Sequence, residues 1–131
     1  MITPLAFLAI AVTVPSDEPV VTTIAAVHAS PEQYAGQLIR LRGWINRCRP
    51  LSCSISERPA ETFRDQGRRL SIAADANFDR LVREKTPVHV VIDAAFSSVC
   101  MKDEVCLDRA PQLTIVRAAL DPSGDTLPTR D

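Results

Sequence analysis

One stretch in the first half of the chain, residues 37–46, alternates apolar and other side chains with a period of two. Its sequence is QLIRLRGWIN, in which Ile39, Leu41, Gly43 and Ile45 face one way. The opposite face carries Leu38, Arg40, Arg42, Trp44 and Asn46. Successive side chains of a β-strand point to opposite faces, so this alternation predicts a strand with one buried side. Such a strand folds only beside other strands, and this limits the chain to a β architecture.

Four later segments also have the pattern of strands. They are residues 53–57, 69–75, 87–96 and 112–118. The longest of them, 87–96, places Val88, Val90, Ile92, Ala94 and Phe96 on one face. In the third strand, Leu70, Ile72 and Ala74 are predicted to point inward. The chain therefore offers five strands in all.

Two helical segments interrupt this series. Residues 75–86 have Asp75 as a capping residue, an apolar stripe of Phe78, Leu81 and Val82, and Pro87 just beyond their end. A shorter turn is expected to begin at Pro31, with Ser30 as its cap, and to end near Tyr34 before Gly36.

The order strand, strand, strand, helix, strand, strand resembles the OB-fold. The stretch SPEQYAGQLIRLRGWI, residues 30–45, is also similar to the opening of many bacterial OB-domains, with Gly43 where the coiled first strand needs a residue without Cβ. The resemblance covers roughly residues 22–118. It implies an all-β fold with minor helix, a five-stranded Greek-key barrel with one helix between strands three and four. Because this fold carries many functions, the resemblance does not name an activity.

The ends of the chain differ from this barrel. Residues 1–19 combine an apolar run, Leu5–Val12, with a small-residue A-x-A pattern and the polar linker PSDEP, which predicts a signal peptide and a periplasmic or secreted protein. No Lys or Arg precedes the run, so a leading strand of a cytoplasmic protein is the alternative. The run is too short to span a bilayer. Residues 20–119 form the predicted OB-domain, and 120–131 a disordered tail rich in turn residues.

Four cysteines occur as two close pairs, Cys48 with Cys53 and Cys100 with Cys106. In an OB-fold the loops that hold them rise from the same end of the barrel and flank the usual ligand face. An exported protein would oxidise them, and local pairing within each loop is the preferred connectivity over pairing between the loops. Four thiolates on adjacent loops could instead hold zinc, although the spacing is longer than the usual C-x2-C.

Arginine is concentrated in one part of the chain. Residues 36–70 hold eight Arg against three acidic residues, a local charge of +5, whereas the whole chain carries −1. Basic residues beside an aromatic suit a single-stranded nucleic acid, but the chain has one Trp and one Tyr, and the second cysteine loop is acidic.

The sequence contains no nucleophile, P-loop, metalloprotease or dinucleotide motif, so we expect neither an enzyme nor a cofactor or metal. The chain is therefore predicted to be a small exported OB-fold protein of the cell envelope, with a binding or structural role and with disulfides that hold the mouth of the barrel. Its predicted partner is an envelope protein or an anionic polymer. The predicted ligand-binding residues are Arg40, Arg42, Trp44, Arg47 and Arg49, on the face of strands one to three beside the cysteine loops. A cytoplasmic single-stranded nucleic-acid-binding protein and a zinc-stabilised OB-domain are the alternatives.

Overall fold

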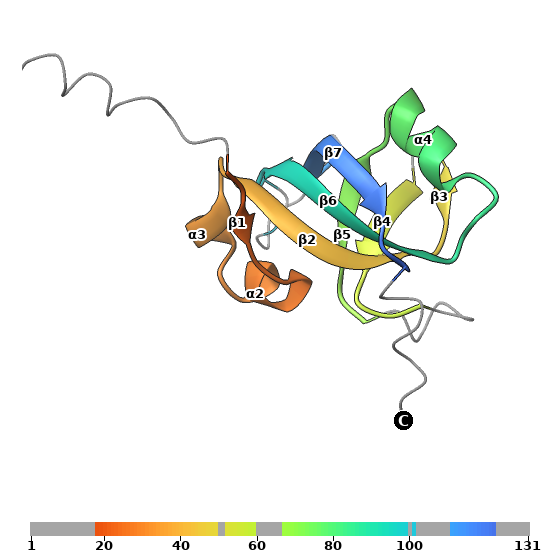
Figure 1. Cartoon of the computed structure of the whole chain (residues 1–131). Helices are drawn as coiled ribbons and strands as arrows, with labels where there is room; N and C mark the ends of the chain where they lie inside the picture. The colour runs from red at the N-terminus through yellow and green to blue at the C-terminus, as the bar shows by residue number, and fades with distance from the viewer. Residues whose placement is uncertain (1–17, 50–51, 60–66, 100, 102–110, 123–131) are drawn as a thin grey trace, which may run out of the picture.

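A computed structural model describes residues 18–49, 52–59, 67–99, 101 and 111–122, and its centre is a closed five-stranded β-barrel (Figure 1). The barrel strands are β2 (Leu38–Ile45), β4 (Ser52–Ser56), β5 (Arg69–Ala73), β6 (Val88–Phe96) and β7 (Leu113–Leu120). All five predicted strands are present, and α4 (Ala76–Val82) lies between β5 and β6. The predicted all-β barrel with minor helix is therefore confirmed.

The strands close into a ring through a fixed set of pairings. β2 pairs antiparallel with β4 on one edge and with β6 on the other. β4 pairs antiparallel with β5, and β6 with β7. The ring is completed by β5 and β7, which run parallel. This arrangement is OB-like, since consecutive strands are neighbours except where the last strand inserts between the third and the fourth.

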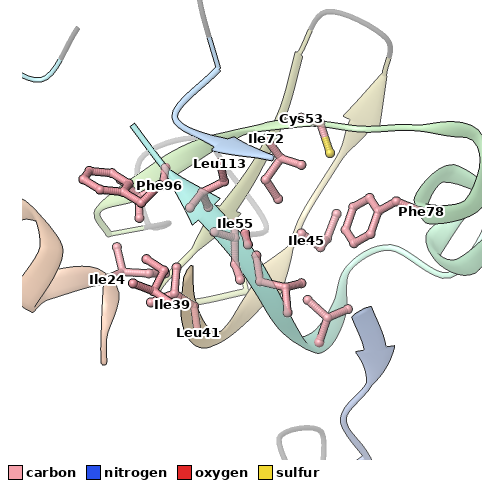
Figure 2. Close-up of a cluster of buried hydrophobic side chains, with 14 of the residues drawn as sticks. Ile24, Ile39, Leu41, Ile45, Cys53, Ile55, Ile72, Phe78, Phe96 and Leu113 are labelled. Carbon is pink, nitrogen blue, oxygen red and sulfur yellow. The ribbon is translucent and has the colours of Figure 1, made fainter. Parts of the chain in front are cut away.

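The barrel interior is filled by the side chains that the alternation assigned to it. Ile39, Leu41 and Ile45 of β2 are fully buried, and Figure 2 shows them packed with residues of the other strands. The five inward residues predicted for β6 are all buried as well: Val88, Val90, Ile92, Ala94 and Phe96. Burying this apolar surface is the main source of stability for such a small domain.

Gly43 lies where β2 contacts both neighbouring strands. Trp44, the next residue, is opposite Ser56 of β4 on one edge and opposite His89 of β6 on the other. A Cβ atom on Gly43 would lie 2.7 Å from Ile55 Cγ1 and 2.8 Å from the Ser56 carbonyl oxygen. The predicted need for a residue without a side chain at this point of the strand is therefore explained by the close approach of β4.

The helix between strands three and four begins as predicted. The Asp75 carboxylate accepts a hydrogen bond from the Phe78 backbone N–H at 2.8 Å. Phe78 and Val82 are buried in the core, and Leu81 packs against it. Figure 1 shows α4 at the end of the molecule near β3, away from the helices that precede the barrel.

The N-terminal part of the domain contains elements that the sequence did not predict. α2 (Ile24–Ala29) is capped by Thr23, whose hydroxyl accepts from the Ala26 N–H at 3.0 Å, and it buries Ile24 and Val27. β1 (Val20–Val21) pairs parallel with the start of β2. Six helical residues are too few to give a clear helical period, so the sequence did not indicate α2.

The short turn α3 (Pro31–Tyr34) begins and ends as predicted, and Ser30 is at its N-cap position, but not as a side-chain cap. The Ser30 side chain makes no capping hydrogen bond. Instead, its backbone N–H donates to the Ala26 carbonyl and ends α2. Ser30 is therefore the junction of two consecutive helices.

Several predictions concern residues outside the described part of the chain. The apolar leader, the second cysteine pair Cys100 and Cys106, and the tail from residue 123 onward are among them. β7 extends through Leu120, one residue past the predicted end of the domain. Within the described residues, no helix is both long and apolar enough to cross a membrane.

Candidate ligand-binding faces

A disulfide-bonded hairpin stands at one end of the barrel. β3 (Cys48–Arg49) pairs antiparallel with β4, with Cys48 opposite Cys53 and Arg49 opposite Ser52. The two cysteines form a disulfide, as local pairing predicts for this pair, and Cys53 is buried in the core. Two of the four sulfur atoms are thus bonded to each other and not available as thiolate ligands. No cluster of metal-ligating side chains occurs in the described ranges, which do not include the second pair.

The outer face of β4 and β5 is hollowed into a groove of about 600 Å³. Hydroxyl groups line it, from Ser52 and Ser54 on β4 and Ser71 on β5. Pro111 and Gln112, which lead into β7, form another wall. The groove therefore lies between the first cysteine hairpin and the residues that lead into β7.

Hydrogen bonds fix the polar groups on one side of this groove. The side-chain oxygen of Gln112 accepts from the Ser71 backbone N–H at 2.8 Å. In return, the Gln112 backbone N–H donates to the Ser71 hydroxyl at 2.9 Å. The side chain of Gln112 is therefore held against β5, which couples the wall of the groove to its floor.

The charge of this groove is positive. Arg69 lines it and has no acidic partner among the described residues, and no Asp or Glu is found among the described residues that line it. With Nε2 protonated, His28 of α2 donates to the Arg69 carbonyl at 2.8 Å, which anchors the backbone that carries this guanidinium. Register places Arg49 opposite Ser52, so the hairpin adds a second exposed arginine near the other end.

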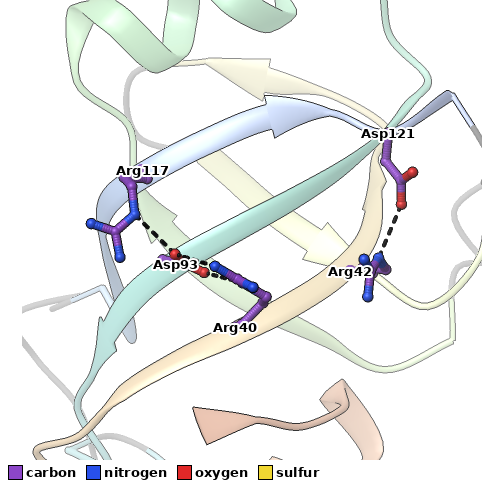
Figure 3. A network of polar contacts seen from close by, with 5 residues as sticks. All are labelled: Arg40, Arg42, Asp93, Arg117 and Asp121. Carbon is purple, nitrogen blue, oxygen red and sulfur yellow. Dashed lines mark hydrogen bonds and ion pairs between the residues drawn. The ribbon is translucent and has the colours of Figure 1, made fainter. Parts of the chain in front are cut away.

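The predicted residues Arg40 and Arg42 lie on a different face, formed by β2, β6 and β7 (Figure 3). Arg40 donates from Nε and Nη2 to the two carboxylate oxygens of Asp93, at 2.7 and 3.0 Å. Arg117, on β7, donates from Nε to the same carboxylate at 3.0 Å. The Asp93 side chain is only 4% exposed, so its charge is compensated by two arginines rather than by water.

These contacts shift the ionisation of the buried acid. The hydrogen bonds from Arg40, with a smaller contribution from Arg117, lower the pKa of Asp93 below its ordinary value, although burial opposes the change. The same pair raises the pKa of Arg40, chiefly through its hydrogen bond to Asp93. Asp93 therefore remains a carboxylate at any physiological pH.

A second set of contacts occupies the other end of this face. Arg42 Nε donates to Asp121 Oδ2 at 3.2 Å. His89 Nδ1 lies 3.2 Å from the same oxygen, but the angles do not make a hydrogen bond. The ring of Trp44 meets His89 edge to face, with centroids 5.0 Å apart. Trp44 therefore packs against a neighbouring strand instead of standing free as a stacking platform.

The five predicted ligand-binding residues are thus divided between two regions. Arg40, Arg42 and Trp44 lie on the outer face of β2, against β6. Arg47 and Arg49 are exposed on the connection to β4, beside the disulfide. Sequence reasoning missed the groove serines and Gln112. The alternation of serines in residues 52–56 is the one signal that could have indicated a polar outer face.

Comparison with known proteins adds little to this description. No known protein family matches the chain, and no curated protein is similar to it in sequence. Among solved structures, one described as an aspartyl-tRNA synthetase from Leishmania major Friedlin is similar, with 10% identity and a TM-score of 0.46. The similarity covers 82% of this chain and 22% of the other. The description of the fold therefore rests on the strand pairings above.

Proposed function

We propose that this protein is a small exported binding module of the cell envelope, without enzymatic activity, which holds an anionic polymer in the β4–β5 groove. One observation carries the proposal. The groove brings the guanidinium of Arg69, which has no acidic partner among the described residues, together with serine hydroxyls, and none of its described lining residues is acidic. Guanidinium and hydroxyl groups are the donors that sulfate, phosphate and carboxylate oxygens accept.

The spacing of the two arginines favours an extended ligand. Arg49 is opposite Ser52, and Arg69 is opposite Ser56, four residues further along β4. At roughly 3.3 Å per residue, this corresponds to about 13 Å. Consecutive charges of a polymer match this separation of the two backbone positions, with one charge for each guanidinium.

The chemistry of the groove favours an anionic glycan over a single-stranded nucleic acid. Single-stranded nucleic acids are held by aromatic platforms as well as by positive charge. No aromatic residue is among the described residues that line the groove, and Trp44 packs on His89 elsewhere. Hydroxyl and amide groups, which the groove does have, suit the polar surface of a sugar.

The Cys48–Cys53 disulfide supports export, because disulfides persist mainly in oxidising compartments. The test is the intact mass of the protein recovered from its native cells without reductant. A chain that begins after about residue 11 and lacks two hydrogens for each disulfide is the expected result. A full-length chain with free thiols would contradict export. If that chain also carried zinc, and a chelator lowered its melting temperature, the zinc-stabilised alternative would replace the present proposal.

The groove is tested by reversing the charge of Arg69. We expect the wild-type protein to bind heparin, with an affinity that falls as NaCl rises, and Arg69→Glu to weaken this binding about tenfold, the effect of losing one charged hydrogen bond. Arg83→Glu is the matched control, since it makes the same change at an exposed arginine of the α4 C-terminus. Equal losses in both variants would mean that heparin senses only net charge. Tighter binding to polyuridylate than to heparin would favour the nucleic-acid alternative.

A further inference from the structure

The face of β2, β6 and β7 has a regular layout. Register places Arg40, Asp93 and Arg117 in one row across the three strands. The next row is formed by Arg42, Val91 and Ala119. Since Val91 and Ala119 are short, they leave a hollow of about 480 Å³ with arginines around it and methyl groups on its floor.

The arginines around this hollow are held in place by acidic residues, but not all of their N–H donors are used. Arg40 uses Nε and Nη2 on Asp93, while Arg42 and Arg117 each use only Nε on their acidic partners. A guanidinium carries five N–H donors, so each group has donors left over. Their side chains are 40%, 59% and 55% exposed, in the order Arg40, Arg42 and Arg117. The remaining donors are therefore accessible to a ligand.

The carboxylates at this face also do not balance the positive charge of its arginines. Three arginines line the hollow, whereas the carboxylates bonded to them are those of Asp93 and Asp121. Among the described residues, one positive charge is therefore left over at this face. Asp93 is buried, so it acts from below and holds the guanidinium groups of Arg40 and Arg117 on either side of itself, as Figure 3 shows. Side chains held in this way lose less conformational entropy when a ligand binds.

We infer that this hollow is a second, separate binding site, for an oxyanion attached to a small apolar group. The carboxylate or phosphate oxygens of the ligand would accept from Arg40, Arg42 and Arg117, and its apolar part would lie on Val91 and Ala119. The site shares no lining residue with the β4–β5 groove. The two proposals can therefore be tested independently, and failure of one does not decide the other.

The test is a titration of the ¹⁵N-labelled protein, followed through the Nε–Hε signals of its arginines. Sodium phosphate, sodium propionate and sodium chloride are compared at constant ionic strength. We expect the signals of Arg40, Arg42 and Arg117 to move and to saturate at millimolar oxyanion, while that of Arg83, which lies in neither site, stays still. Saturation by phosphate alone identifies a phosphate ligand, and saturation by propionate identifies a carboxylate.

Two variants make the result specific. Arg117→Gln should weaken binding about tenfold, as expected for one charged hydrogen bond, and it leaves Asp93 with its two bonds from Arg40. Arg83→Gln is its matched control, because it also removes an exposed arginine from an ion pair, the one with Asp79. Ala119→Glu should abolish binding, because its carboxylate would fill the hollow and compete for the free donors of the arginines around it, while Asp93 itself is left in place.

Three outcomes would overturn the inference. The first is a shift that chloride reproduces at the same ionic strength. The second is a shift that grows without saturating and spreads to all arginines. The third is unchanged binding in Arg117→Gln and in Ala119→Glu. Any of them would mean that the arginines of this face serve only to compensate Asp93 and Asp121.

Discussion

The two outer faces of the barrel both carry arginine, but they use it differently. On the β2–β6–β7 face, Arg40 and Arg117 are bonded to Asp93 of β6, and Arg42 is bonded to Asp121, just after β7. On the β4–β5 face, Arg69 has no acidic partner among the described residues. The first face is a largely compensated network that fixes its side chains, and the second is an uncompensated groove. The number of arginines in a segment is therefore a poor guide to where an anion binds, because partners from distant strands decide how much charge is left.

The largest expected loss of stability comes from changing Gly43, where β2, a strand of the first face, approaches β4, a strand of the second. Gly43→Ala would place a Cβ within 2.8 Å of the Ser56 carbonyl, which is backbone and cannot rotate away. We expect a loss of about 3 kcal/mol in the free energy of unfolding, at the upper end of the cost of overpacking. Urea denaturation measures it, and both faces should lose binding together.

Gly36→Ala is the control for this variant. Gly36 has a φ of 77°, but no atom lies within 4 Å of the position of its Cβ. The cost there is limited to the left-handed backbone, about 1 kcal/mol. If the two variants lost the same stability, close approach of β4 would not be the reason for Gly43.

A smaller effect, confined to one face, is expected from removing the disulfide. Cys48→Ala combined with Cys53→Ala should cost about 2 kcal/mol in the chain-entropy model, because the closed ring is short. In the described residues, β3 is paired with β4 at two positions, so the hairpin should loosen and heparin binding in the groove should weaken. The Nε–Hε signals of Arg40 and Arg117 should not change. A change in those signals would show that the two faces are coupled.

The smallest of the three effects is expected from Asp93→Asn, which weakens the compensated network. An amide accepts hydrogen bonds less strongly than a carboxylate, and we expect a loss of about 1.5 kcal/mol at pH 7. Asp79→Asn is the control, because its ion pair with Arg83 is exposed and should contribute less than about 0.5 kcal/mol. Thermal unfolding of both variants measures the difference.

The pH dependence of this variant gives a second readout. The folded-state pKa of Asp93 is lower than its ordinary value of 3.8, so its stabilising contribution is complete above that value. It is lost as the pH falls from there through the folded-state pKa. Asp93→Asn should therefore lose less stability than the wild type on acidification. Some acid sensitivity will remain, because the backbone N–H of Arg68 lowers the pKa of Glu57 in the same direction. An unchanged acid response would contradict the role given to Asp93.

Much of the fold follows from local patterns in the sequence. The period-two alternation in β2 and β6 identified the buried residues, because a strand that is half buried must repeat every second residue. Asp75 marked the start of α4, which ends at Val82, before Pro87. The resemblance to the OB-fold indicated a residue without Cβ at Gly43, and the structure supplied the reason, the close approach of β4. α2 was not predicted, because its six residues give too few repeats of the helical period.

The sequence by itself determined which side chains face the barrel core, and it concentrated arginine in the first half of the chain. Only the tertiary structure decided which of these arginines are compensated. Asp93 is 53 residues from Arg40 and 24 from Arg117, and they meet because β6 lies between β2 and β7. Register across a barrel depends on the closure of all five strands at once, so no local pattern encodes it. For that reason the sequence predicted arginines on an outer face, but not that Arg40 and Arg42 are paired with acids while Arg69 has no acidic partner in the described part of the chain.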